Sequence, residues 1–221
     1  MKGLFVKDLR LMMIQGRVMA VIVVLVLIMW GILGIADGGA VLGYVMIMLS
    51  IYIPSLISYD EMDNGYAWLF TMPVSRKQYV LEKYIFGILG ITAGGLLCAL
   101  IGAVQIIAAG AEEDPKEWLF TCAVFILIGI LFQALVMPFR LKYEGDKGRV
   151  VMFAVIVVFV LLFYGAVKLA GMFAADVEQQ IMSFLDSLGV AGMLGCGAVI
   201  TAAAVTVSAL CSCRIMVKRE F

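Results

Sequence analysis

Residues 59–83 read YDEMDNGYAWLFTMPVSRKQYVLEK and form a polar interruption between two long apolar runs. Acidic residues open this stretch, an aromatic and aliphatic cluster follows, and Pro73 closes the cluster. A side-chain oxygen of Asp63 or Asn64 can cap a helix that begins at Gly65, and Pro73 ends that helix because the residue before a proline avoids the helical conformation. The sequence therefore predicts a short helix on a loop between two membrane spans.

A second helix is predicted to begin after Ser75. Ser75 and Gln78 have the spacing of a capping box, in which each side chain accepts a hydrogen bond from the backbone amide of the other residue. This helix can continue through Lys83 into the following span. Two interpretations of the stretch stay open: a docking surface for another protein, or an amphipathic loop that lies on lipid headgroups.

Composition identifies an integral membrane protein. Of the 221 residues, 64% are hydrophobic and 14% are charged, whereas soluble domains have about 45–50% and about 25%. The net charge is zero and no basic patch is interleaved with aromatic residues, so the sequence does not indicate a nucleic-acid partner. Histidine, the most common metal ligand and general base, is absent. All five cysteines lie in or beside apolar runs and are interpreted as small hydrophobic residues.

Apolar runs of about 20 residues, the length that crosses the hydrocarbon core as a helix, occur six times. They cover residues 18–36, 39–58, 85–109, 119–137, 150–171 and 189–211. Helical spacing of apolar residues predicts an amphipathic helix over residues 1–17, whose basic residues would meet anionic lipid headgroups. Residues 172–188 form a second amphipathic segment, either an external lid or a plain interfacial helix. We therefore predict an all-α integral membrane protein with six transmembrane helices in one domain, residues 1–221.

The basic residues orient these spans. Of the 16 lysines and arginines, only Lys116 and Lys168 fall on the side opposite the termini. The positive-inside rule then places both termini, the 59–83 loop and the 139–149 loop in the cytoplasm. Acids, lysines and arginines are missing from the middle of every predicted span, which argues against a carrier driven by protons or sodium ions.

Polar side chains within the spans are candidate cavity residues. We single out Tyr52, Gln105 and Gln133, because an unpaired amide in lipid is costly and should face protein or a cavity. They would line a substrate route or form hydrogen bonds between helices, and the sequence leaves both possibilities open. Glycines four residues apart in the second and third spans predict close contacts between helices.

Catalytic motifs are absent from the sequence. It contains no G-x-x-x-x-G-K-[ST] phosphate loop, no H-E-x-x-H zinc motif and no G-x-S-x-G nucleophile elbow. We therefore assign no catalytic residue and no metal ligand, and we interpret the acids of residues 59–83 as helix caps and solvated charges. A membrane domain without an energy-coupling motif of its own needs a partner that supplies energy.

The same stretch resembles the loop between the second and third spans of the ABC-2 type permease family. The shared pattern is an acid, three residues, a glycine, aromatic and aliphatic residues, and then Pro-Val-Ser-Arg. It consists of Glu61, Gly65, Trp68, Leu69, Phe70, Thr71, Pro73, Val74, Ser75, Arg76 and Lys83. The resemblance implies a type-2 ABC exporter transmembrane domain in which residues 60–72, from Asp60 onward, are a cytoplasmic coupling helix that docks on an ATPase.

Partners and cargo also follow from this resemblance. It implies a permease subunit of an ATP-binding-cassette exporter in a bacterial plasma membrane, which dimerises with a second copy or a paralogue. The chain is expected to hold no cofactor and to be no enzyme, while a separate ATPase subunit binds ATP and magnesium. The start, MKGLFVKDL, resembles permeases of Gram-positive exporters for amphipathic peptides, including phenol-soluble-modulin exporters and bacteriocin self-immunity transporters.

The expected cargo is an amphipathic toxin or antimicrobial peptide. An apolar cavity would suit lipids or drugs as well, so these stay open as alternatives. A different class of function is also open, namely an immunity or scaffold protein that sequesters a peptide and transports nothing.

Overall fold

The computed structural model describes most of the chain. The described residues are 2–15, 17–31, 38–61, 65–69, 71, 74–109, 115–143, 145, 147–148, 150–155, 157–158, 161, 165 and 175–218. Within them the helices are α1 (Lys2–Gln15), α2 (Arg17–Gly31), α3 (Gly38–Ser55), α4 (Ile57–Glu61), α5 (Gly65–Leu69), α6 (Arg76–Ala109), α7 (Pro115–Lys142) and α9 (Ala175–Lys218). These ranges contain helices and no strand, which confirms the all-α prediction for the described part of the chain.

Helices long and apolar enough to cross a membrane occur four times among the described residues. They are Gly38–Glu61, Arg76–Ile107, Pro115–Lys142 and Gly189–Lys218. The first predicted span, residues 18–36, corresponds to α2, which is described over 15 residues. The predicted fifth span, residues 150–171, falls largely outside the described residues. Six spans therefore remain a prediction, of which four are present as long apolar helices.

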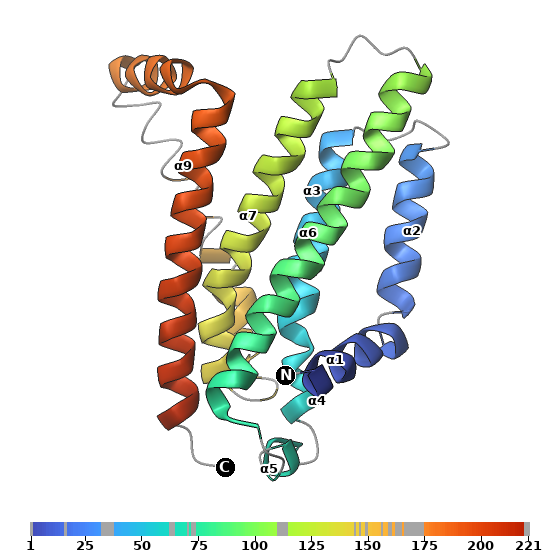
Figure 1. Cartoon of the computed structure of the whole chain (residues 1–221), viewed down its shortest axis with the longest axis vertical. Helices are drawn as coiled ribbons and strands as arrows, with labels where there is room; N and C mark the ends of the chain where they lie inside the picture. Colours follow the sequence, from blue (N-terminus) through green and yellow to red (C-terminus); the bar gives the residue numbers. More distant parts are fainter. Residues whose placement is uncertain are drawn as a thin grey trace.

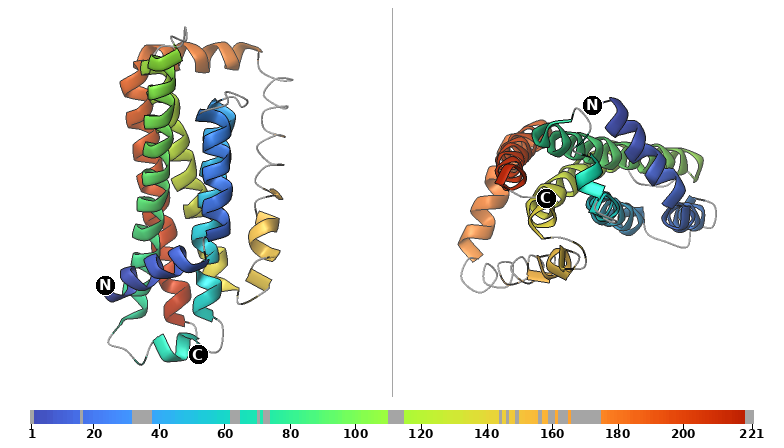
Figure 2. Two further views of the ribbon diagram at one scale, coloured as in Figure 1. Left: turned by 90° about the vertical axis from the view of Figure 1, so that its right-hand side faces the viewer. Right: turned by 90° about the horizontal axis from the view of Figure 1, so that it is seen from below.

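The helices form a bundle with α1 lying crosswise at one end (Figures 1 and 2). α3, α6 and α7 contact one another along their lengths, and α9 packs against α7 and α6. α1, α4 and α5 lie at the lower end in Figure 1, which we call the α5 end. This end collects elements that are far apart in the sequence.

Small residues on α6 let its neighbours approach closely. A Cβ atom on Gly102 would overlap the Trp118 ring of α7, and a Cβ on Gly95 would overlap the Ile126 side chain. The Trp118 indole donates a hydrogen bond to the Ala99 carbonyl of α6 at 3.2 Å. The two glycines from which close contacts of the third span were predicted, Gly90 and Gly94, lie equally close to α3, because a Cβ on them would overlap the side chains of Ile53 and Leu49.

Two helix boundaries test the sequence reading. The Ser75 amide donates to Gln78 Oε1 at 3.1 Å and the Gln78 amide donates to Ser75 Oγ at 3.2 Å, so the predicted capping box is confirmed at the start of α6. α7, in contrast, continues to Lys142, past the predicted end of the fourth span at Met137. Arg140, predicted to lie in the following loop, is therefore a helical residue.

Polar contacts connect α9 to α6 and α7. The Tyr84 hydroxyl of α6 lies 2.6 Å from Ser208 Oγ and 2.8 Å from Ser212 Oγ of α9. Ser208 in turn donates to the Ala134 carbonyl of α7. At the start of α6, the Arg76 guanidinium donates to the Val217 carbonyl at 3.0 Å, so it satisfies a carbonyl that the last turn of α9 leaves open.

α9 changes direction along its length (Figure 1), and its helical conformation is interrupted at Gly189. Its φ of 63° and ψ of 173° interrupt the helix, and this backbone region is accessible almost only to glycine. A Cβ atom built there would meet nothing within 4 Å, so the constraint lies in the backbone and not in packing. The side chains of residues 175–188 are outside the described set, so the amphipathic character predicted for residues 172–188 is not tested.

We predict that Gly189→Ala destabilises the chain by about 1–3 kcal/mol, because alanine must adopt a strained backbone conformation. Gly195→Ala is the matched control: its Cβ also meets nothing within 4 Å. It lies in regular helix, where alanine is favoured by about 0.5–1 kcal/mol. Unfolding by SDS titration in detergent micelles measures both variants, and equal effects would rule out a backbone constraint at Gly189.

Candidate functional site

Two adjacent acids at the end of α4 organise the α5 end. Pro54 lies near the end of α3, and a turn at Leu56 separates α3 from α4. Asp60 and Glu61 then follow each other in helical conformation, so their side chains leave the helix about 100° apart. Each acid reaches a different set of helices.

Asp60 belongs to a cluster that we call the acid–lysine cluster: Lys7 and Asp8 of α1, Asp60 of α4, and Lys83 of α6. The Lys83 ammonium lies 2.9 Å from Asp60 Oδ2 and also pairs with Asp8 Oδ2. Lys7 pairs with Asp60 Oδ1. The Tyr79 hydroxyl donates to Asp60 Oδ2 at 2.8 Å, which completes the hydrogen bonds of this carboxylate.

Most of the charged side chains in this cluster are buried, so the energy of their pairing is large. The side chain of Asp8 is fully buried, and those of Lys83 and Asp60 are 1% and 6% exposed. A buried charge is tolerated only when it is paired, since its desolvation penalty is large. α1, α4 and α6 therefore hold together as a unit, because separating any one of them exposes or orphans a charge of another.

Glu61 belongs to a second cluster, the arginine cluster, with Arg140 of α7. Arg140 Nη2 lies 2.6 Å from Glu61 Oε2 and also donates to Ser58 Oγ at 2.8 Å. Its Nη1 donates to the Tyr143 carbonyl at 2.9 Å. The Gly145 amide donates to Glu61 Oε2 at 3.0 Å, so the chain beyond α7 is drawn onto the same carboxylate.

These two clusters correct one prediction from the sequence. The acids of residues 59–83 were expected to be helix caps and solvated charges, and this is wrong for Asp60 and Glu61. Both carboxylates are buried partners in ion pairs between helices. The physical reason is that α4 continues the second span, so its acids face the bundle and not the solvent.

α5 begins at Gly65, where the sequence predicted a helix start, and packs against both clusters. Gly65 has no room for a side chain, because a Cβ would lie 2.5 Å from the Asp60 carbonyl oxygen. The buried Tyr66 ring meets the Tyr79 ring edge-on at 5.8 Å, and its hydroxyl lies 3.5 Å from Glu61 Oε1. Leu69 is buried as well. α5 is thus attached to the ion pairs through its own aromatic residue.

The remaining coupling residues predicted from the sequence are only partly described. Thr71 is exposed directly after α5. The Trp68 side chain, Phe70 and Pro73 lie outside the described residues, as do Asp63 and Asn64, the predicted caps. Within the predicted coupling segment, residues 60–72, the structure describes residues 60–61 as the end of α4, residues 65–69 as α5 and Thr71 as a turn, so one helix over 60–72 stays a prediction.

The three cavity candidates occupy different surroundings. Gln105 of α6 donates to the Trp30 carbonyl of α2 at 2.6 Å, which is a hydrogen bond between helices. Gln133 of α7 is buried against Gly87 of α6, and its amide atoms have no hydrogen-bond partner among the described residues. The Tyr52 hydroxyl is likewise buried and unpaired within that part of the chain.

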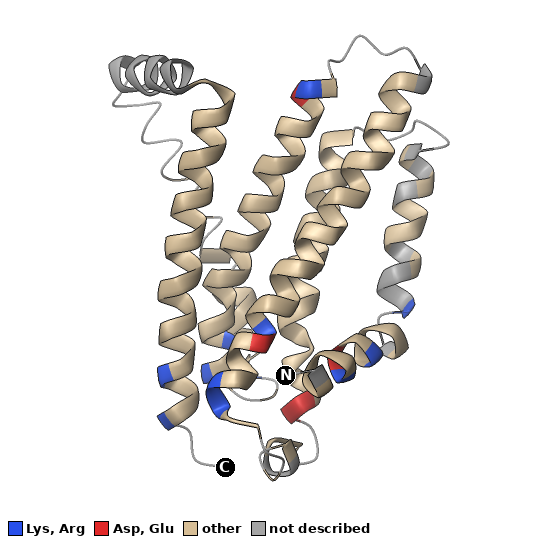
Figure 3. Cartoon of the chain, viewed as in Figure 1, with Lys and Arg blue, Asp and Glu red and all other residues tan. Residues whose placement is uncertain are grey.

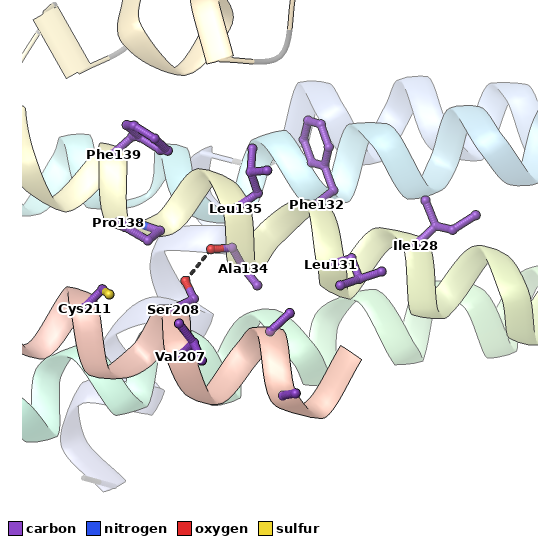
Figure 4. A pocket seen from close by; sticks show the side chains of 12 residues that line it. Ile128, Leu131, Phe132, Ala134, Leu135, Pro138, Phe139, Val207, Ser208 and Cys211 are labelled. Atoms are coloured by element: carbon purple, nitrogen blue, oxygen red, sulfur yellow. Dashed lines mark hydrogen bonds between the residues drawn. The ribbon is translucent and has the colours of Figure 1, made fainter. Parts of the chain in front are cut away.

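An apolar pocket of about 970 Å³ lies elsewhere, between α7 and α9 (Figure 4). Phe132, Leu135 and Phe139 of α7 face it, and Ala204 and Val207 of α9 complete the opposite side. None of the three cavity candidates from the sequence lines this pocket. In the sequence, the small residues of α9 that line the pocket look the same as small residues that pack between helices. The sequence therefore did not indicate the pocket.

Sequence reasoning also missed Asp8, Lys83 and Arg140 as partners. One signal was available for Asp8, because it follows Leu4 by four residues and so lies on the apolar face of a basic amphipathic helix. An acid on a helix face that packs against other helices needs a buried cation as its partner. Lys83 and Arg140 gave no such signal, because basic residues at the end of a span are ordinarily solvated at the membrane surface.

We predict that Arg140→Met lowers stability by about 3–5 kcal/mol, because it leaves the Glu61 carboxylate buried and unpaired. Lys142→Met, on the exposed side of the same helix, should change stability by no more than about 0.5 kcal/mol. The double variant E61Q/R140M should recover part of the loss. SDS unfolding of the purified chain compares all three, and an equally mild effect at both positions would contradict the buried pair.

Comparison with known families identifies the architecture. The family described as "ABC-2 family transporter protein" matches residues 3–217, nearly the whole chain. Curated proteins and solved structures yielded no match. The match spans all helices described above, including the α4–α5 segment and both ion-pair clusters. The chain therefore belongs to the ABC-2 transporter family and is a membrane transport component.

Proposed function

We propose that this chain is the permease subunit of an ATP-binding-cassette exporter, driven by a separate ATPase subunit that binds ATP and magnesium. The observation that carries the proposal is the connection of α5 to two buried ion-pair clusters. Through Asp60 and Glu61, a force applied to α4 and α5 reaches α1, α6 and α7. The family match supports this role, and the sequence holds no phosphate loop of its own.

The distribution of charge supports a cytoplasmic position for the α5 end. Figure 3 shows the charged residues of the described helices gathered at that end, apart from a group at the start of α7. Lysine and arginine accumulate on the cytoplasmic side of membrane proteins. In a bacterial plasma membrane, α5 and its surroundings would then face the compartment that contains the ATPase.

Docking would use residues of the α5 segment other than Tyr66 and Leu69. Tyr66 and Leu69 are buried and hold α5 in place, so the alternate positions on this short helix and the residues after it, Trp68, Phe70 and Thr71, are the proposed contact set. Nucleotide binding would draw two ATPase subunits together, and α5 would transmit this motion to the spans of two permease copies. Such a change requires unequal interaction with the two states, which docking at α5 supplies.

The proposed cargo is an amphipathic peptide. The pocket between α7 and α9 accepts an apolar side chain or segment, because its wall is made of aliphatic and aromatic groups. Its one strongly polar wall residue, Ser208, is already engaged with Tyr84 and Ala134. A pocket with this chemistry selects for apolar surface and offers little to a purely polar cargo.

The docking proposal predicts that W68A/F70A abolishes association with the ATPase. Wild type should co-purify from native membranes with an ATPase subunit in mild detergent, and the double variant should lose it or its ATP hydrolysis. Ile85→Ala, exposed on α6, is the control and should behave as wild type. Glu61 is left unchanged because its removal would disrupt the arginine cluster.

If no ATPase associates with the chain in any of the solubilisation conditions tried, the exporter proposal is wrong. The chain would then be better explained as an immunity or scaffold protein that sequesters a peptide. That protein would bind peptide without nucleotide and would be indifferent to W68A/F70A.

The cargo proposal predicts that Ala204→Phe, which places an aromatic ring in the pocket, reduces export of an amphipathic peptide by up to about tenfold, because the ring takes the place of one apolar group of the cargo. ATPase association should be unaffected. Ala202→Phe, on the exposed side of α9 and outside the pocket, should transport normally. Uptake into inverted vesicles measures this, and equal transport by both variants would exclude the pocket from the cargo path.

A further inference from the structure

Glu82 of α6 is a buried acid that the ion pairs above do not include. The residue is 3% exposed. Both of its carboxylate oxygens are buried and have no hydrogen-bond partner among the residues that the structure describes. An ionised carboxylate in such surroundings is strongly unfavourable unless a cation or a proton neutralises it.

The position of Glu82 places it at the docking face of α1. Glu82 and Lys83 lie one turn before Phe86, on the buried side of α6. Phe86 meets Phe5 of α1 edge-on, with ring centroids 5.3 Å apart. Asp8 of α1 pairs with Lys83, the residue next to Glu82. Glu82 is therefore held in the α1–α6 contact.

Charge balance around Glu82 is incomplete. The charged groups that act on it come from α1, α4 and α6, and they are Lys7, Asp8, Asp60 and Lys83. Lys83 is already committed to Asp8 and Asp60, and Lys7 to Asp60. The cluster thus holds two ammonium groups against two carboxylates, and an ionised Glu82 would add a third carboxylate with no further cation beside it in the described part of the chain.

Tyr79 does not donate a hydrogen bond to the Glu82 carboxylate. Its hydroxyl lies on the same face of α6 and donates to Asp60 Oδ2 at 2.8 Å. Its ring lies beside the Lys83 ammonium, 5.2 Å from the ring centroid, and so supports the cation that is already shared. The Tyr79 donor is therefore used, and neither lysine of the cluster bonds Glu82, so a proton on Glu82 itself is the simplest way to neutralise the site.

We propose that Glu82 is a proton-binding site that controls the docking of α1. With a proton, Glu82 is neutral and the acid–lysine cluster is balanced, so α1 stays on α6. When the proton leaves, the new carboxylate repels Asp8 and competes with it for Lys83, which weakens the hold on α1. The inference concerns this chain alone and does not depend on an ATPase partner.

The sign of the pH dependence follows from proton counting. The folded chain holds one proton on Glu82, whereas the unfolded chain, with Glu82 in water, is ionised near neutral pH. Folding therefore takes up a proton, and stability falls as the pH rises. One proton changes the unfolding equilibrium constant by at most about tenfold for each pH unit.

The test compares purified full-length wild type, E82Q and E117Q in detergent at a series of pH values from mildly acidic to mildly alkaline. Glu117 is an exposed acid at the other end of α7, so its variant is the matched control. SDS titration should show a pH slope in wild type and E117Q that is smaller in E82Q by the contribution of one proton. The protection factors of the α1 amides, which correct hydrogen exchange for its intrinsic rise with pH, should fall as the pH rises in wild type and stay constant in E82Q.

Infrared spectroscopy of the wild type gives a measurement that does not require the variant to fold. A protonated carboxyl band at neutral pH, lost at alkaline pH together with protection of α1, is the expected result. Parallel pH profiles for wild type and E82Q, or a wild type without a protonated carboxyl at neutral pH, would overturn the proposal. Replacing sodium and potassium by choline should have no effect, and a shift of the profile would assign the site to a metal cation instead.

Discussion

The ammonium group of Lys83 is buried, and this one charge sets the arrangement of the α5 end. It can stay there only if carboxylates from other helices reach it, and Asp8 and Asp60 do so. The requirement fixes where α1 must lie and which way α4 must face. Aliphatic packing alone would permit α1 to slide along α6, whereas a buried ion pair permits one position, because displacement leaves a charge unpaired.

The adjacent acids Asp60 and Glu61 then connect this arrangement to the rest of the bundle. Asp60 belongs to the cluster of α1 and α6, and Glu61 belongs to that of α7. One turn of helix therefore joins two sets of elements by ion pairs, and the same elements also meet in an apolar cluster that includes Tyr79 of α6 and Leu141 of α7. α5, attached through Gly65 and Tyr66, inherits its position from the same turn. A short helix held in this way moves with the helices of the bundle and not independently of them.

Local patterns in the sequence predicted the helices well. Pairing between residues far apart in the sequence determines how these helices pack, and local patterns do not reveal it. The capping box of Ser75 and Gln78 and the helix start at Gly65 depend on residues within one turn, so their spacing sufficed. The burial of Lys83 and Arg140 depends on partners 75 and 79 residues away, and nothing in a hydropathy pattern separates a paired charge from one at the membrane surface. The cavity candidates lie away from the pocket for a related reason: amide side chains stand out in an apolar run, whereas the aliphatic groups that line a pocket look like any other apolar residue.

The distance along the chain between Asp8 and Lys83 has a consequence for biosynthesis. α1 is made before α6, so Asp8 can pair only with its neighbour Lys7, at 3.2 Å, until α3, α4 and the first turns of α6, which carry Lys83, have been made. Until then α1 must wait at the water–lipid boundary, where Asp8 stays hydrated. Its docking is therefore a late assembly step that completes only after the second and third apolar segments have been inserted, and a nascent chain arrested before Lys83 lacks the contact that would hold its own N-terminus.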